Sequence, residues 1–82
     1  MSEPQPNARA DHVIDARDWE PPEPFVATMD TLAVMAPNER LLLILSREPH
    51  PLYRALLKQG YRYEAEFTPE GVFEILIWRE GL

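Results

Sequence analysis

The residues of this chain that could do chemistry gather in two short segments, both rich in proline. Asp15–Pro24 contains an Asp-x-Arg pair and three prolines, and Glu48–Pro51 holds a histidine between two prolines. Proline is tolerated in the first turn of a helix, so each segment predicts a helix start. A helix start disfavours the imidazolium, which leaves a neutral His50 free to accept a hydrogen bond or a metal.

A metal at His50 would need two or three further protein ligands. The chain offers one other histidine, His12, together with scattered carboxylates. We therefore expect no metal and no cofactor. A small metal-binding or ligand-binding protein centred on His50 remains an alternative, beside a His50 that only caps its helix.

The absence of cysteine excludes more chemistry than any residue present adds. With no thiol in the 82 residues, disulfides, zinc-thiolate sites, iron–sulfur clusters and thiol nucleophiles are all excluded. The sequence also lacks a Ser-His-Asp order, a glycine-rich phosphate loop and a convincing carboxylate pair. We predict that the protein is not an enzyme.

Size and charge limit the partners. Fourteen acidic against eight basic side chains give a net charge of −6, which repels nucleic acid and anionic lipid surfaces. The longest apolar run, Leu41–Leu45, is too short to span a bilayer, and Met1–Ala10 resembles neither a secretory signal nor an anchor. We expect a cytoplasmic protein with a protein partner or with self-association.

The first half of the chain predicts a tail, a strand and a helix. Met1–Asp11 is polar and is expected to be disordered, so that a single domain covers residues 12–82. His12–Ala16 is a short strand. A helix should begin near Pro22 and end at Pro37-Asn38. Its predicted buried stripe is Phe25, Met29, Leu32, Ala33 and Ala36.

The second half predicts a central strand, a second helix and a hairpin. Leu41–Leu45 is apolar on both sides, as a central strand requires. A helix runs from His50 to a Lys-Gln-Gly ending, and Tyr61–Phe67 and Val72–Arg79 form an antiparallel pair. The order β-α-β-α-β-β predicts an α+β two-layer sandwich, with two helices on one face of a four-stranded mixed sheet.

The other sheet face has no predicted cover. If Phe73, Ile75 and Ile77 face the helices, then Leu76 and Trp78 face away from them. We predict that Leu76 and Trp78 form part of an apolar interface for a protein partner.

The first segment resembles the opening of the TusA and SirA sulfur carriers, whose pattern is D-x-R-x-L-x-C-P-x-P. Asp15, Arg17, Pro22 and Pro24 match it, whereas Trp19 replaces the leucine and Pro21 occupies the cysteine position. The second segment, Glu48–Tyr53, looks like a signature of an uncharacterised, cysteine-less branch of this superfamily, domain of unknown function 2249. Members of that branch are often stand-alone bacterial proteins or are fused to hemerythrin-like domains.

This resemblance implies the TusA-like fold and no assigned activity. The candidate binding residues on the two segments are Arg17, Pro21, Pro22, Glu23, His50 and Tyr53. Because Pro21 has no nucleophile, the chain is unable to carry a persulfide, and the prolines also remove amide donors that would bind an anion. We expect a non-catalytic interaction or regulatory module. The alternative is an accessory protein of sulfur or redox metabolism that docks on a sulfur-transfer partner.

Overall fold

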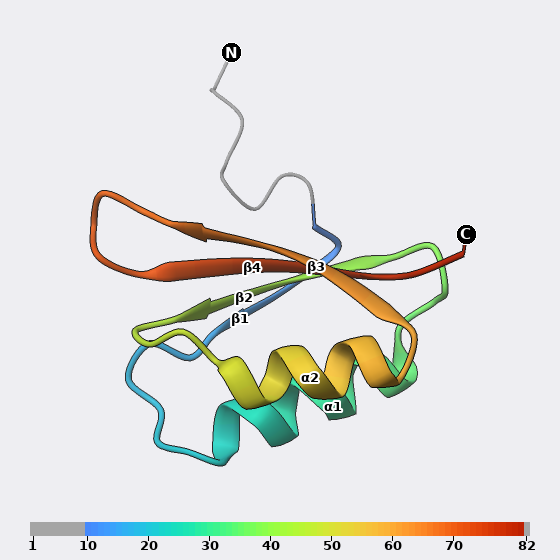
Figure 1. Cartoon of the computed structure of the whole chain (residues 1–82), viewed down its shortest axis with the longest axis horizontal. Coiled ribbons are helices and arrows are strands. Elements are labelled where there is room, and N and C mark those ends of the chain that lie inside the picture. The colour runs from blue at the N-terminus through green and yellow to red at the C-terminus, as the bar shows by residue number, and fades with distance from the viewer. Residues whose placement is uncertain (1–9, 82) are drawn as a thin grey trace.

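The computed structural model describes residues 10–81, which form a four-stranded sheet with two helices on one face (Figure 1). In chain order the elements are β1 (His12–Asp15), α1 (Glu23–Val34), β2 (Arg40–Leu45), α2 (His50–Lys58), β3 (Tyr61–Phe67) and β4 (Phe73–Arg79). The predicted α+β two-layer sandwich and its β-α-β-α-β-β order are confirmed.

The strands lie in the order β1-β2-β4-β3. β1 runs parallel to β2 with Val13 opposite Leu42, and β2 runs antiparallel to β4 with Leu42 opposite Leu76. β3 and β4 form the predicted antiparallel hairpin. β2 is thus an interior strand, in agreement with its unbroken apolar run, and five of its six residues, all but Arg40, are buried or partly buried.

α1 begins at Glu23, directly after the cluster of prolines. Pro22 is the N-cap residue, and Pro24 occupies the first turn, where a missing N–H leaves no hydrogen bond unmade. The helix ends at Val34, earlier than the predicted Pro37-Asn38, because Met35 is already extended with ψ of 148°. The proline at position 37 favours extended backbone in the residue before it, so the chain leaves the helix ahead of it.

The buried stripe of α1 differs from the prediction. Leu32 is buried and Met29 packs on the core, but Phe25, Ala33 and Ala36 are exposed. The fully buried positions are Thr28 and Leu32, with Met35 packed beside them. α1 is apolar almost all round, so its hydrophobic pattern does not define one face, and the polar type of Thr28 concealed its burial.

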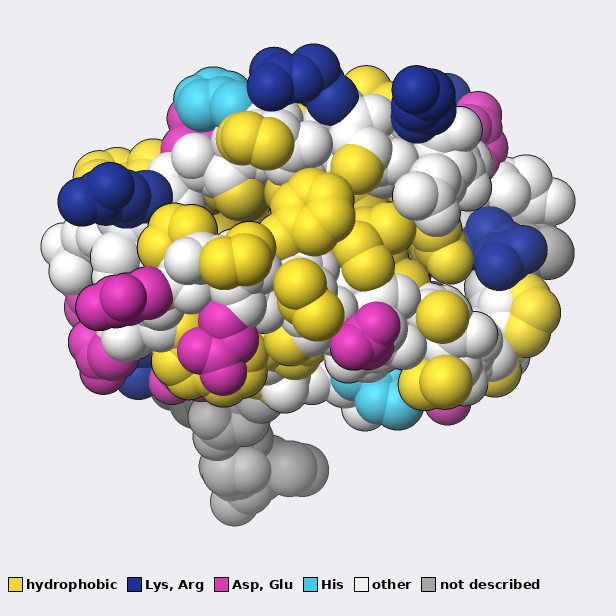
Figure 2. Space-filling view, turned by 90° about the horizontal axis from the view of Figure 1, so that it is seen from below, with side chains coloured by type: hydrophobic (Ala, Val, Ile, Leu, Met, Phe, Trp, Pro, Cys, Tyr) yellow, Lys and Arg dark blue, Asp and Glu magenta, His cyan; other side chains and the backbone are white. Residues whose placement is uncertain are grey.

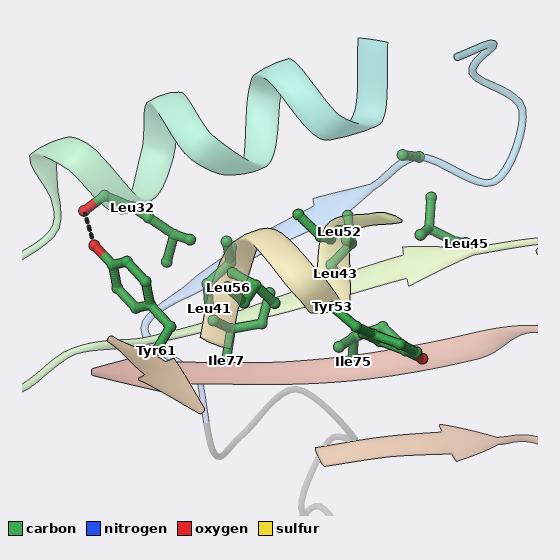
Figure 3. Packing of buried hydrophobic residues seen from close by; sticks show 11 residues of the cluster. Leu32, Leu41, Leu43, Leu45, Leu52, Tyr53, Leu56, Tyr61, Ile75 and Ile77 are labelled. Carbon is green, nitrogen blue, oxygen red and sulfur yellow. Dashed lines mark hydrogen bonds between the residues drawn. The ribbon is translucent and has the colours of Figure 1, made fainter. Parts of the chain in front are cut away.

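The core lies between the helix layer and the sheet, where side chains from both helices and all four strands converge (Figure 3). β2 and β4 contribute Leu41, Leu43, Ile75 and Ile77, all with no exposed surface. At the end of the helices, the Tyr61 hydroxyl donates to the Leu32 carbonyl at 3.4 Å. That contact ties the start of β3 to α1.

α2 begins at His50 with a proline in its first turn and ends with Lys58 in its last. Leu52, Tyr53 and Leu56 are buried, whereas Leu57 is exposed. The Tyr53 ring stacks on Tyr63 of β3 with ring centroids 4.2 Å apart and planes within 2°. This stack, worth about 1 kcal/mol beyond the area it buries, fixes α2 over the hairpin.

The hairpin extends beyond α2 (Figure 1), so its far end is uncovered and Phe67 is exposed. On the opposite face of the sheet, Leu76 and Trp78 point away from the helices as predicted. Leu76 is nevertheless only 3% exposed and Trp78 is half-buried, with the Arg40 guanidinium 5.3 Å from the Trp78 ring centroid. The apolar surface open to a partner on this face is therefore smaller than expected.

Most of the expected tail, residues 1–9, lies outside the described residues. Asp11, its predicted last residue, is already part of the fold: its amide donates to the Arg40 carbonyl, and its carboxylate accepts from the Arg40 amide, both at 2.9 Å. Within residues 10–81, no helix has the length and apolar character needed to cross a membrane.

Candidate functional site

A cleft of about 820 Å³ opens at the edge of the sheet where β1 and β2 end. Because these strands are parallel, the loops that leave their carboxyl ends meet there, which is the usual place for a binding site in such sheets. The loop from Ala16 to Pro22 forms one wall and the loop from Ser46 to Pro49 forms the other. The cleft thus unites the two proline-rich segments of the sequence.

The cleft is largely apolar. Leu43, Leu45 and Leu52 line it from β2 and α2. Trp19 and Phe25 also line it, and both rings are partly exposed at its edge. Five prolines also line it: Pro21, Pro22, Pro24, Pro49 and Pro51. Fixed proline backbone and leucine side chains give a rigid, hydrophobic cavity of the size that holds small ligands or peptide side chains.

Main-chain donors are scarce in the cleft despite the two helix starts. Prolines remove three donors from the turn before α1 and its first residues, and the Glu23 amide already donates to the Glu20 carbonyl at 2.9 Å. At α2 the His50 amide donates to the Glu48 carbonyl at 3.1 Å. A phosphate or sulfate site at a helix start depends on free amides, so this geometry is poor for either anion.

The side chain of Arg17 pairs with Asp15, so its charge is already neutralised at the cleft. Its guanidinium binds the Asp15 carboxylate at two points, Nε to Oδ1 at 2.8 Å and the terminal nitrogen to Oδ2 at 2.7 Å. This pairing holds the pKa of Asp15 below its usual value and raises the pKa of Arg17. The Ser46 hydroxyl donates to the Arg17 carbonyl at 2.7 Å, so the loop is fastened to the end of β2.

His50 and Tyr53 form a small cluster with Glu48 at the start of α2; Glu48 lines the cleft, and the other two residues lie outside its lining. The Tyr53 hydroxyl donates to Glu48 Oε2 at 3.0 Å, and His50 Nε2 lies 3.5 Å from Glu48 Oε1. The imidazole packs edge-on against the Tyr53 ring, with centroids 5.7 Å apart. Burial, and next the hydrogen bond to Glu48, raise the pKa of Tyr53, which therefore stays a protonated donor.

Metal ligands do not converge anywhere in the described part of the chain. Residues 10–81 contain no group of three or more histidine, aspartate or glutamate side chains suited to one ion. His12 lies on β1, where its Nε2 is 2.9 Å from Glu39 Oε1, and this contact lowers the pKa of Glu39. No observation favours a metal at His50.

The structure brings together only part of the predicted site. Arg17, Pro21 and Pro22 line the cleft, whereas Glu23, His50 and Tyr53 lie beside it and outside its lining. Leu76 and Trp78 are on the opposite face of the sheet, so they belong to a separate surface.

Sequence reasoning missed Arg47, which lines the cleft and has no ion-pair partner among the described residues. Its position just beyond the carboxyl end of β2 was the available signal, since that end of a parallel strand faces the binding edge. Phe25 was assigned to the core and instead lies at the cleft.

The lining carries no activated nucleophile. Its one hydroxyl, that of Ser46, donates to a main-chain carbonyl and has no base beside it, and Pro21 has no reactive side-chain atom.

Comparison with known proteins agrees with this fold. A crystal structure of a SirA-like protein from Desulfitobacterium hafniense superposes with a TM-score of 0.74 at 22% sequence identity, covering 87% of this chain and 99% of that one. No curated protein matches the chain. The sequence pattern of one family, described as an uncharacterized conserved protein (DUF2249), matches residues 13–79. The chain therefore belongs to the DUF2249 family and has a SirA-like fold without cysteine.

Proposed function

We propose that this protein is a non-catalytic interaction module that binds a segment of a partner protein in the cleft. One observation carries the proposal: the cleft is built by the segment that resembles the cysteine loop of sulfur carriers, yet Pro21 occupies the cysteine position and most of the lining is apolar. A site that is kept in shape but lacks a nucleophile fits recognition better than catalysis.

The chemistry of the cleft indicates the kind of segment. Apolar floor residues and two edge aromatics favour an apolar side chain, and aromatic side chains commonly anchor protein interfaces. The carboxylates of Asp18, Glu20 and Glu48 line the cleft and outnumber Arg47, its one cation without an ion-pair partner among residues 10–81, which favours a Lys or Arg next to that side chain. The prolines reduce the entropy lost on binding because the loop is already fixed.

The test begins with peptides selected by display on the immobilised full chain, whose affinities are then measured by calorimetry. We expect the selected peptides to combine an apolar residue with a basic one. Phe25→Ser should lower the affinity of these peptides at least about tenfold, because one aromatic contact with the bound peptide is lost. Phe67→Ser, the same change at an exposed ring outside the cleft, is the matched control.

Equal binding by the wild type and by Phe25→Ser would contradict the cleft as the docking site. So would amide chemical-shift changes that cluster on the sheet face around Trp78 rather than around Trp19. The second result would move the interaction to the face that the sequence first suggested.

A second candidate is an accessory protein of sulfur or redox metabolism that docks on a sulfur-transfer enzyme. The Asp15–Arg17 pair supports it, because two short hydrogen bonds preserve the conformation of the loop that matches the carriers. We expect a cysteine desulfurase to bind the chain without transferring sulfur to it, and Arg17→Ala or Glu23→Ala to weaken that binding. No measurable complex with a desulfurase or a sulfurtransferase would exclude this role.

A further inference from the structure

The outward surface of α1 is apolar and acidic. Val26 is half exposed and Val34 is 84% exposed, although both are large hydrophobic residues. The charged residues of this helix are Glu23 and Asp30, both exposed, and α1 contains no lysine or arginine. Figure 2, which views the helix layer from outside, shows hydrophobic side chains across the middle of this face and acidic side chains in its lower half.

The outward surface of α2 is apolar and basic. Arg54 and Lys58 are exposed, Leu57 beside them is 54% exposed, and α2 contains no aspartate or glutamate. Lysine and arginine side chains accordingly gather along the upper edge of the face in Figure 2. Within residues 10–81, none of the charged groups of α1 and α2 named here forms an ion pair.

The two helices lie side by side and start at the same edge of the sheet. Phe25 of α1 and Leu52 of α2 line the same cleft near the helix starts. Toward the other end, Tyr61, which follows α2 after a two-residue turn, donates to the Leu32 carbonyl of α1. The helix face therefore presents an acidic apolar strip next to a basic apolar strip.

We propose that this helix face is a self-association surface, on which α1 of each copy packs against α2 of a second copy. A two-fold axis that runs between the helices, along their direction, produces both contacts at once, as a self-complementary interface requires. Val26 and Val34 then lie against the partner copy's α2, and Asp30 lies near its basic residues. A two-fold axis across the helices would instead set α1 on α1 and acid against acid, so charge selects the first arrangement.

The size of the surface predicts a weak dimer. α1 has 12 residues and so is about 18 Å long, and two helices of about 10 Å diameter are about 20 Å wide. This footprint, about 360 Å² on each copy, is below that of standard stable interfaces and falls among weak, transient ones. The unpaired charges and the exposed Val34 indicate that the face is better matched by a second copy than by water.

The test uses the full chain and two variants with opposite charge changes. Asp30→Lys makes α1 less acidic, and Arg54→Glu/Lys58→Glu makes α2 acidic. All three positions are exposed, so circular dichroism should show unchanged folds. Sedimentation equilibrium should show a concentration-dependent wild-type dimer, and each variant alone should dissociate at least about tenfold more readily.

Mixing the two variants distinguishes a second copy from any other occupant. In the mixture, the lysine introduced at position 30 of one variant meets the acidic α2 of the other, and the remaining contact keeps wild-type charges, so a heterodimer should return to near wild-type affinity. A wild type that stays monomeric up to about 1 mM would overturn the proposal, as would a mixture that stays monomeric. The residues tested lie outside the cleft lining, so this outcome is independent of peptide binding there.

Discussion

Replacing Thr28 by valine should stabilise the protein. Thr28 is 0% exposed, and its hydroxyl oxygen has no hydrogen-bond partner among the described residues. A buried hydroxyl without a partner costs about 1–3 kcal/mol of desolvation free energy. Valine keeps the shape and has a similar helix propensity, so Thr28→Val should raise the free energy of unfolding by about 1–2 kcal/mol.

The assay is urea unfolding followed by far-UV circular dichroism, with thermal unfolding as a second measurement. For a domain of this size, each 1 kcal/mol should raise Tm by about 4–8 °C. Thr31→Val, the same change at a half-buried position of α1, is the matched control and should stay within about 0.5 kcal/mol of wild type. Thr28→Ser keeps the hydroxyl and loses the methyl group, so it should destabilise by about 1 kcal/mol.

A destabilising Thr28→Val would refute the reasoning. It would mean that the hydroxyl has a hydrogen-bond partner in solution, which valine cannot replace. An equal gain from Thr31→Val would refute it differently, because the effect would then come from the helix rather than from burial.

Three further outcomes follow from the packing and the charges. Leu56→Ala, at a side chain with no exposed surface, should cost about 2–5 kcal/mol, whereas Leu57→Ala, next to it and exposed, should cost less than about 1 kcal/mol in urea unfolding at low protein concentration. Arg17→Ala should return the pKa of Asp15 toward its usual 3.8 in an NMR titration. Because the wild-type Asp15 carboxyl has a lowered pKa, the stability that its pairing with Arg17 adds is fully present at pH values above 3.8. It should vanish as the pH falls through the lowered pKa of Asp15 in the folded protein. Pro21→Cys should give a thiol whose pKa, read from alkylation rates, is not below about 8.5, since glutamates flank it and prolines replace amide donors; a pKa under 7 would contradict this account of the loop.

The order of the elements was predictable because each has a local physical cause. The prolines before α1 and within α2 fit the first turn of a helix, and the unbroken leucine run has a stable place only in the sheet interior. The alternation in Tyr61–Phe67 predicted its strand, but not that Phe67 would lie beyond the end of α2, since that depends on the length of another element.

The cleft could be predicted only in part. Each proline-rich segment was recognised separately, while their meeting depends on the parallel pairing of β1 with β2, which hydrophobic pattern does not reveal. His50 was predicted as a site residue because of its residue type. In the structure its imidazole contacts Glu48 and the Tyr53 ring and does not line the cleft. The buried side of α1 could not be predicted for a different reason. Apolar residues lie on nearly all sides of this helix, so the hydrophobic pattern does not indicate which side faces the core.

The position of β3 at the rim of the sheet has a consequence for how copies of this protein meet. Its outer backbone faces no strand among residues 10–81, and such edges are where chains add to one another and aggregate. The side chains of Arg62, Glu64 and Glu66 alternate along the face away from the helices, and charge on an edge disfavours the addition of another strand. With a net charge of −6, random stacking is further opposed by repulsion. Edge-to-edge association of two copies through β3 is thus disfavoured.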